Sequence, residues 1–199
     1  WDGCKTLVEY MNLECNNLSS FSWEGCPESL KTVNLQDNEL KNFSWEGCPE
    51  SLESIDLDGN HLTSFSWEGC PQSFKEIHLG GNELRSFSWE GCPQSLERID
   101  LGNNQLTSFS WEGYPPKSLE RINLFNNKLN SFLWEGCPQS IKEIYLNSNR
   151  LTSFSWEGCS QSLEKVYLTG NKFTDYSWEG CPESVKDIYL TSDQLITIK

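Results

Sequence analysis

Residues 30–49 read LKTVNLQDNELKNFSWEGCP, and this stretch returns with small changes along the whole chain. Trp marks the repeat, because its nine copies are 22 residues apart at every step except one, which is 23. A fixed period of this length is typical of solenoids and other repeat arrays. No linker interrupts the repeat, so we interpret residues 1–199 as a single domain. Its nine units start at Trp1, Trp23, Trp45, Trp67, Trp89, Trp111, Trp134, Trp156 and Trp178.

The apolar residues of one unit predict a short strand followed by turns. Val33 and Leu35 alternate with polar neighbours, which is the period of a strand with one buried face. A single strand cannot bury these side chains, but stacked units can form a parallel sheet with strands about 4.8 Å apart. Gly47 and Pro49 break helices, so after the strand we expect turns and at most a short second strand. The side chains expected in the shared core are Leu30, Val33, Leu35, Leu40, Phe43, Trp45 and Cys48.

The first half of the unit has the pattern L-x-x-L-x-L-x-x-N-x-L, as in Leu52-x-x-Ile55-x-Leu57-x-x-Asn60-x-Leu62. Over essentially the whole chain this pattern resembles the leucine-rich repeat family. The second half, Phe-x-Trp-x-Gly-Cys, is similar to the BspA-like subclass, with one more residue before the next Leu. The resemblance implies an α/β-type leucine-rich-repeat solenoid with about nine parallel strands on its concave side and little or no helix. It also implies that partners bind on the concave face.

Two further rows of equivalent residues are interpreted as parts of the scaffold. An inward amide in every unit can satisfy backbone groups of the adjacent loop. One Cys in each unit suits a small buried apolar position, and we expect these thiols to be unpaired. The Asn row is Asn16, Asn38, Asn60, Asn82, Asn104, Asn127, Asn149 and Asn171, followed by Asp193. The Cys row is Cys4, Cys26, Cys48, Cys70, Cys92, Cys137, Cys159 and Cys181, with Tyr114 in the ninth place and Cys15 outside the row.

The net charge of −14 argues against a nucleic-acid partner, because phosphate binding needs a basic face. More than half of this charge comes from the residue after each Trp, which is always acidic. We interpret these carboxylates as acceptors for backbone N–H groups at the next turn or as partners of a Lys. The acidic row is Asp2, Glu24, Glu46, Glu68, Glu90, Glu112, Glu135, Glu157 and Glu179. No run of 18 apolar residues is present, so we expect no membrane insertion.

The sequence offers little for catalysis or for a bound cofactor. His61 and His78 are the only histidines, and no nucleophile–His–carboxylate order or phosphate-binding glycine loop is recognisable. One Cys in each unit forms a line rather than the tetrahedron that zinc requires. We therefore expect no catalytic residues, no cofactor and no metal.

Outward positions that differ between units are free to bind a partner, and three rows on the predicted concave face are informative. The charge row alternates in sign and is interpreted as a source of cross-strand ion pairs. It is Glu9, Lys31, Glu53, Lys75, Glu97, Glu120, Lys142, Glu164 and Lys186. The second row is Tyr10, Thr32, Ser54, Glu76, Arg98, Arg121, Glu143, Lys165 and Asp187. The central row is Asn12, Asn34, Asp56, His78, Asp100, Asn123, Tyr145, Tyr167 and Tyr189.

The last three members of the central row form the Tyr ladder: Tyr145, Tyr167 and Tyr189. Tyr is favoured at contact sites because it offers a large surface at a low entropic cost, although it also suits strands in general. Phe125 adds an aromatic side chain in a neighbouring outward row that is otherwise small or polar. The predicted partner-binding surface comprises Tyr145, Tyr167, Tyr189, Phe125, Arg98, Arg121, His78, Asp56 and Asp100.

The predicted function is non-enzymatic recognition of a protein whose identity the sequence does not give. The alternative is a structural or surface-adhesion array in which the repeats act as a spacer. A third hypothesis is an ice-binding solenoid, because two outward Ser rows flank the Phe position. The unpaired Cys row favours the cytosol, whereas the BspA-like resemblance favours a cell surface. The sequence therefore does not decide the compartment. Trp1 begins in mid-unit without a polar cap, so we expect flanking sequence or an end-to-end contact with another chain.

Overall fold

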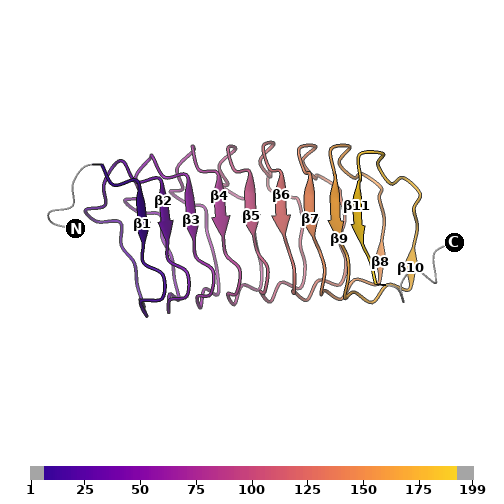
Figure 1. Cartoon of the computed structure of the whole chain (residues 1–199), viewed down its shortest axis with the longest axis horizontal. Helices are drawn as coiled ribbons and strands as arrows, with labels where there is room; N and C mark the ends of the chain where they lie inside the picture. Colours follow the sequence, from indigo (N-terminus) through magenta and orange to yellow (C-terminus); the bar gives the residue numbers. More distant parts are fainter. Residues whose placement is uncertain (1–6, 192–199) are drawn as a thin grey trace.

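The computed structural model describes residues 7–191 and is a curved β-solenoid in which each repeat makes one coil (Figure 1). Nine parallel strands form one sheet in the order β1-β2-β3-β4-β5-β6-β7-β9-β11, so sequence neighbours are also neighbours in space. This confirms the predicted fold. The strands are β1 (Tyr10–Asn12), β2 (Thr32–Asn34), β3 (Ser54–Asp56), β4 (Glu76–His78), β5 (Arg98–Asp100), β6 (Arg121–Asn123), β7 (Glu143–Tyr145), β9 (Lys165–Tyr167) and β11 (Asp187–Tyr189).

The strand register brings equivalent residues of consecutive units side by side. Thr32 is opposite Ser54, and the step from Arg98 to Arg121 absorbs the inserted residue without shifting the register. Each predicted row is therefore a physical row across the sheet. In each of the strands β1 to β9 of this sheet the middle residue is buried and its two neighbours are less buried, as the period of two requires.

Indole rings form the core of the stack. The Trp side chains from Trp23 to Trp156 are at most 3% exposed. Within a coil the Phe ring meets the Trp ring edge-on, with centroids 4.9 Å apart at 90° for Phe43 and Trp45. Between coils some indoles are nearly parallel, as for Trp89 and Trp111 at 6.0 Å. The indole N–H of each buried Trp donates to a backbone carbonyl of the next coil, for example from Trp45 to Ser66 (2.9 Å).

The Asn row connects adjacent coils, as predicted. Nδ2 of Asn60 donates to the carbonyls of Leu57 in its own coil (3.1 Å) and Leu35 in the preceding coil (3.0 Å). Its Oδ1 accepts the backbone N–H of Leu40, also in the preceding coil (3.0 Å). The amide thus satisfies backbone groups that the turn would otherwise leave buried and unpaired. Asp193, the last member of this row, lies outside the described residues.

The convex side consists of turns. One short parallel pair is present there, formed by β8 (Ser153–Phe154) and β10 (Asp175–Tyr176), which matches the expected second strand. The part of the chain that the structure describes contains no α-helix, and in particular no long apolar helix of the kind that crosses a bilayer.

The Cys row differs from the prediction at the insertion. Tyr114 does not occupy the Cys position, because its side chain is 90% exposed. Pro116 accepts the N–H of Leu119 as Pro93 accepts that of Leu96, so Pro116 is the equivalent of Pro93. Pro115 therefore takes the place of the Cys, and Tyr114 is the inserted residue.

Six of the other Cys positions agree with the interpretation of the row as at least partly buried and unpaired. Burial is deepest at Cys70, Cys92, Cys137 and Cys159, and partial at Cys26, Cys48 and Cys181. The thiols of Cys48, Cys70, Cys92, Cys137, Cys159 and Cys181 are free of a disulfide. Burial raises the pKa of the Cys48 thiol to about 12, so it stays protonated at neutral pH. Trp1 and Cys4 lie outside the described residues.

Candidate functional site

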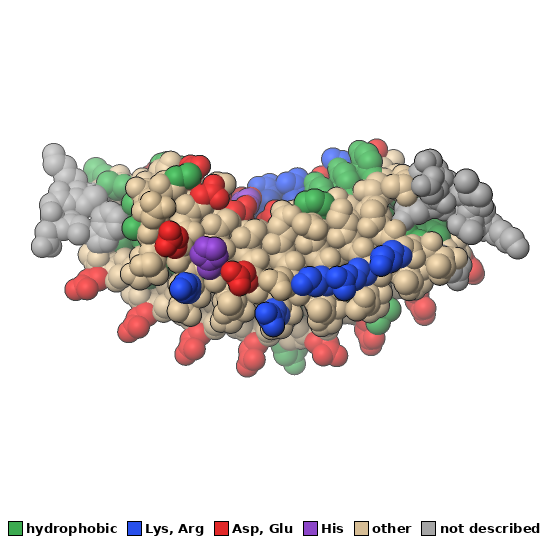
Figure 2. Space-filling model, turned by 90° about the horizontal axis from the view of Figure 1, so that it is seen from below, with side chains coloured by type: hydrophobic (Ala, Val, Ile, Leu, Met, Phe, Trp, Pro, Cys, Tyr) green, Lys and Arg blue, Asp and Glu red, His purple; other side chains and the backbone are tan. Residues whose placement is uncertain are grey.

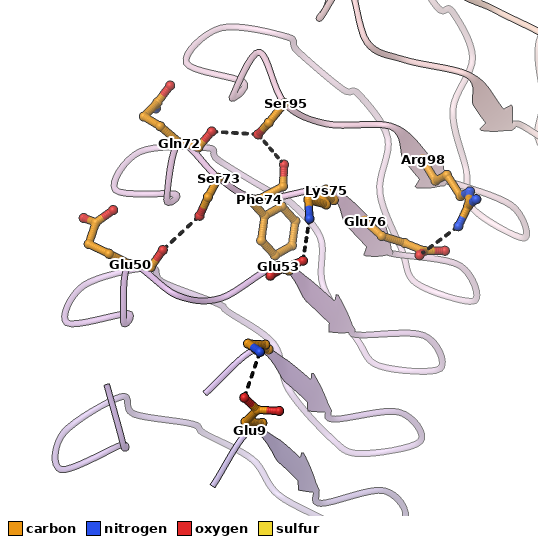
Figure 3. Close-up of polar contacts among 11 residues, drawn as sticks. Glu9, Glu50, Glu53, Gln72, Ser73, Phe74, Lys75, Glu76, Ser95 and Arg98 are labelled. Atoms are coloured by element: carbon orange, nitrogen blue, oxygen red, sulfur yellow. Dashed lines mark hydrogen bonds and ion pairs between the residues drawn. The ribbon is translucent and has the colours of Figure 1, made fainter. Parts of the chain in front are cut away.

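The concave face presents the charge, second and central rows side by side. In the charge row Nζ of Lys75 lies 2.6 Å from the Glu53 carboxylate (Figure 3). Nζ of Lys142 lies 2.6 Å from the Glu120 carboxylate. These pairs are about half exposed, so solvent screening leaves each of them a small contribution to stability. The charge row is therefore satisfied within the sheet, as predicted, and offers few free charges to a partner.

The Tyr ladder is a continuous stack on the last three strands of the sheet. The rings of Tyr145 and Tyr167 are nearly parallel, with centroids 4.3 Å apart and planes 6° apart. Tyr167 and Tyr189 repeat this geometry at 4.3 Å and 2°. Tyr145 and Tyr167 are half-buried, and Tyr189 is 44% exposed. The strand register places the three residues side by side on adjacent strands.

Glu143 lies beside the ladder and connects it to two cations. Its carboxylate accepts a hydrogen bond from the Tyr145 hydroxyl (3.2 Å) and forms ion pairs with Arg121 (2.9 Å) and Lys165 (3.2 Å). Burial raises the pKa of Glu143, but the Lys165 hydrogen bond and both positive charges outweigh it, and the net shift is downward. Burial and the Glu143 charge raise the pKa of Tyr145, so its hydroxyl remains a donor. The Tyr145 side chain is thus held both by stacking on the face of its ring and by the hydrogen bond of its hydroxyl.

The two arginines of the predicted surface do not form one patch. Arg98 and Arg121 are opposite each other in register, but their side chains turn apart. Arg98 lies 3.4 Å from Glu76 in the preceding strand, whereas Arg121 turns to Glu143 in the following strand. Only Arg121 therefore belongs with the Tyr ladder.

The remaining predicted residues lie in two places. Phe125 is half-buried two residues after β6, on the side of the ladder where the chain leaves the strands. His78, Asp56 and Asp100 lie on β3 to β5, where the structure adds a residue that the sequence did not single out. This residue is Asp58, which lies close to Asp56 and His78.

Glu143 and Lys165, like Asp58, were not predicted as site residues. The sequence could have indicated all three residues, because each stands two positions from a central-row residue, in a neighbouring outward row.

The Asp58 carboxyl is held among like charges. Burial, followed by the charges of Asp56 and Asp100, raises its pKa from an ordinary 3.8 to about 6. The folded protein therefore holds this proton more tightly than the unfolded chain. Between about pH 4 and pH 6 the folded state binds more protons, so the free energy of unfolding falls as the pH rises.

We expect Asp58→Asn to stabilise the protein by about 1 kcal/mol at pH 7.5, after allowance for the partial exposure of the carboxyl. The variant should gain nothing at pH 3.5, where both states of the wild type are protonated. Urea denaturation at the two pH values in the presence of a chelator measures this. An equal effect at both pH values would show that the ionised Asp58 carboxylate does not destabilise the folded state.

The acidic row corrects the sequence interpretation. The backbone N–H of Glu46 donates to Oγ of Ser44 (3.1 Å), and the equivalent bond recurs in most coils. Within residues 7–191 the row's carboxylates neither accept a hydrogen bond nor pair with a Lys, and a Ser hydroxyl caps the turn in the coils other than that of Leu133. They are exposed, and acidic side chains project in a regular series along the convex edge in Figure 2. The hydroxyls of the Ser row that contains Ser44 therefore serve local turns.

No protein-family model matches this chain, and no curated protein is similar to it in sequence. Solved structures are similar in fold. A leucine-rich-repeat (LRR) protein of Leptospira interrogans superposes with a TM-score of 0.79 over 94% of this chain at 26% identity. An internalin of Listeria monocytogenes gives a TM-score of 0.73 over 98% of the chain at 16% identity. The LRR domain of a Shigella effector gives 0.69 over 94% at 18% identity.

The share of each similar protein that this chain spans differs between the three. This chain spans 83% of the Shigella domain, but only 60% of the internalin and 52% of the Leptospira protein. At these identities the similarity establishes the architecture of stacked coils with a concave parallel sheet. It does not test the BspA-like resemblance, which stays a prediction.

Proposed function

The chain folds as a leucine-rich-repeat solenoid, and on that basis we propose that it binds another protein through its concave face, without catalysis. The Tyr ladder is the proposed centre of the contact. Arg121, Glu143 and Lys165 would surround it with charges of both signs. The observation that carries the proposal is the stack itself, in which three aromatic rings are aligned at 4.3 Å on a rigid sheet.

The arrangement favours binding because the Tyr side chains have already lost part of their rotamer freedom in the free protein. Association normally costs about 0.5–1.5 kcal/mol for each side chain that loses its rotamer freedom. The ladder rings are already ordered by stacking, and the hydroxyl of Tyr145 is anchored to Glu143. Each ring can still offer its outer edge and hydroxyl to a partner. A partner with aromatic or aliphatic side chains at its centre and mixed charges around them would match this surface.

The alternative is that the array acts as a spacer or adhesion element and uses no particular face. The paired charge row is compatible with that alternative, because its ions are satisfied within the sheet. The two hypotheses differ in one respect. Recognition requires that one face of the coil contact the partner, whereas a spacer is indifferent to changes at any single face.

Site-specific photocrosslinking separates the two hypotheses. Benzoylphenylalanine is introduced at Phe125, beside the ladder, and in a control at Glu135, which is exposed on the convex side. In an extract of the source cells we expect a discrete crosslinked protein from position 125 and none from position 135. The same products from both positions, or products only from position 135, would contradict recognition by the concave face.

A further inference from the structure

Three polar side chains meet where β3 and β4 end. Asp56 is the last residue of β3 and is opposite His78, the last residue of β4. Asp58 follows two residues after Asp56. One potential ligand atom of each of the three residues lies within 4.8 Å of the other two. The next strand adds Asp100, which is opposite His78 on its other side.

Each of the three groups retains a free coordination position. Oδ1 of Asp56 accepts the N–H of Asp58 (2.9 Å), and Oδ1 of Asp58 accepts the N–H of Gly80 (2.6 Å). The second oxygen of each carboxylate has no hydrogen bond in the structure. Nε2 of His78 lies 3.3 Å from Glu76, which leaves Nδ1 available. A carboxylate on one ring nitrogen is the contact that commonly orients a metal-binding histidine.

Glycine beside these groups avoids a close contact with their carboxylates. In the outward row that contains Asp58 and Phe125, the two intervening coils have Gly80 and Gly102. A Cβ at Gly80 would lie 3.1 Å from Oδ1 of Asp58 and 3.3 Å from Oδ1 of Asp100. Gly80 does not have a positive φ, so its backbone would accept another residue. A side chain at this position would therefore press against carboxylate oxygens on two sides.

The cluster also lacks a matching positive charge. Across residues 7–191, no Lys or Arg forms an ion pair with Asp56, Asp58 or Asp100, and the nearby Arg98 is paired with Glu76. Three carboxylates are thus held close together with a single imidazole as the neighbouring base. Such a group attracts a cation more strongly than a paired carboxylate does, since like charges held close together repel each other.

We propose that Asp56, Asp58 and His78 form a binding site for a divalent transition-metal ion of the zinc class. An imidazole nitrogen with two carboxylates suits zinc and its neighbours, whereas calcium and magnesium prefer oxygen ligands alone. With metal–ligand distances of about 2.1 Å, tetrahedral ligand atoms lie about 3.4 Å apart, so small side-chain rotations close the site. Water or a donor from a bound protein takes the fourth position. The sequence did not predict this site, because its three ligands come from two coils.

Isothermal titration of chelator-treated protein with zinc chloride tests the proposal. We expect one zinc ion bound per chain, with the dissociation constant raised at least tenfold in Asp58→Asn and in His78→Gln. Gly80→Ala should weaken binding by a similar factor, because its Cβ would displace the Asp58 carboxylate without removing a ligand. Calcium and magnesium should bind at least tenfold more weakly than zinc.

Two controls exclude other sites. Cys15→Ser and Glu14→Gln alter a separate exposed group formed by Glu14, Cys15 and Asp37, and they should leave zinc binding unchanged. Cobalt substituted for zinc should show no thiolate charge-transfer band. Circular dichroism melting verifies that each variant is folded. Absence of zinc binding in the wild type, or binding that persists unchanged in both Asp58→Asn and His78→Gln, would overturn the proposal.

Discussion

Replacing Trp89 with alanine is expected to lower the free energy of unfolding by about 4 kcal/mol, in the range for large aromatic residues removed from a core. The Trp89 side chain is 1% exposed and lies in the middle of the array. Its ring meets Phe87 edge-on at 4.8 Å and stacks on Trp111 at 6.0 Å. The substitution would also leave the Ser110 carbonyl without the indole N–H that it accepts at 3.1 Å.

Trp178 provides a matched control because its neighbours in sequence are the same. Both residues belong to the segment Ser-Trp-Glu-Gly-Cys, but Trp178 is 40% exposed near the end of the described residues. Trp178→Ala is expected to cost about 1–2 kcal/mol, since it leaves no enclosed cavity. Urea denaturation followed by far-ultraviolet circular dichroism compares the two variants. Equal losses would show that the indole stack does not carry the stability of the array.

The denaturation profile of Trp89→Ala carries further information. In a solenoid each coil contacts only its neighbours, so stability is approximately a sum of coil and interface contributions. A cavity in the middle weakens the contact between the two halves. We therefore expect a broader or two-step transition for Trp89→Ala, whereas Trp178→Ala should retain the steepness of the wild type.

The architecture could be predicted from the sequence because it depends on periodicity alone. Val33 and Leu35 define which side of the strand is buried, and the 22-residue step fixes which residues become neighbours. The Asn row was predictable for the same reason, since a polar residue at an inward position needs backbone partners. Equivalent residues in stacked coils must form rows across the sheet, so the Tyr ladder could be placed before any coordinates were known.

The details that could not be predicted depend on rotamers and on loops. Arg98 and Arg121 are adjacent in their row, but a row does not show that each side chain turns to a different Glu. Asp58 lies beyond the strand, where the period of two no longer indicates the direction of a side chain. Tyr114 was placed in the Cys row because sequence alignment does not tell which residue of an insertion is displaced.

The acidic row shows a second limit of pattern reading. A carboxylate that recurs in every unit was expected to have a recurrent structural role. The structure assigns that role to the preceding Ser, whose hydroxyl accepts the N–H of the Glu, as in Ser88 and Glu90. Repetition alone therefore does not distinguish a residue that supports the coil from one that is only copied with it.

The central claim is that the Tyr ladder is the contact surface for a protein partner. Tyr145, Tyr167 and Tyr189 are changed together to Ser, which removes the rings and retains a hydroxyl in each coil. Aromatic side chains at the centre of an interface each contribute about 2 kcal/mol or more, although the effects of neighbours do not add fully. We expect the affinity for the partner to fall at least about 100-fold, equivalent to about 2.7 kcal/mol.

Tyr10→Ser is the control, because Tyr10 is a 58% exposed Tyr on the same sheet but outside the ladder. The partner is the protein that becomes crosslinked at position 125. The most direct measurement is the dissociation constant of its complex with the wild type, with the triple variant and with Tyr10→Ser. Thermal melting verifies that each of the three is folded. The account predicts a loss of at least about 100-fold in the triple variant and a change of less than about threefold in Tyr10→Ser. A folded triple variant that binds the partner as tightly as the wild type would contradict it.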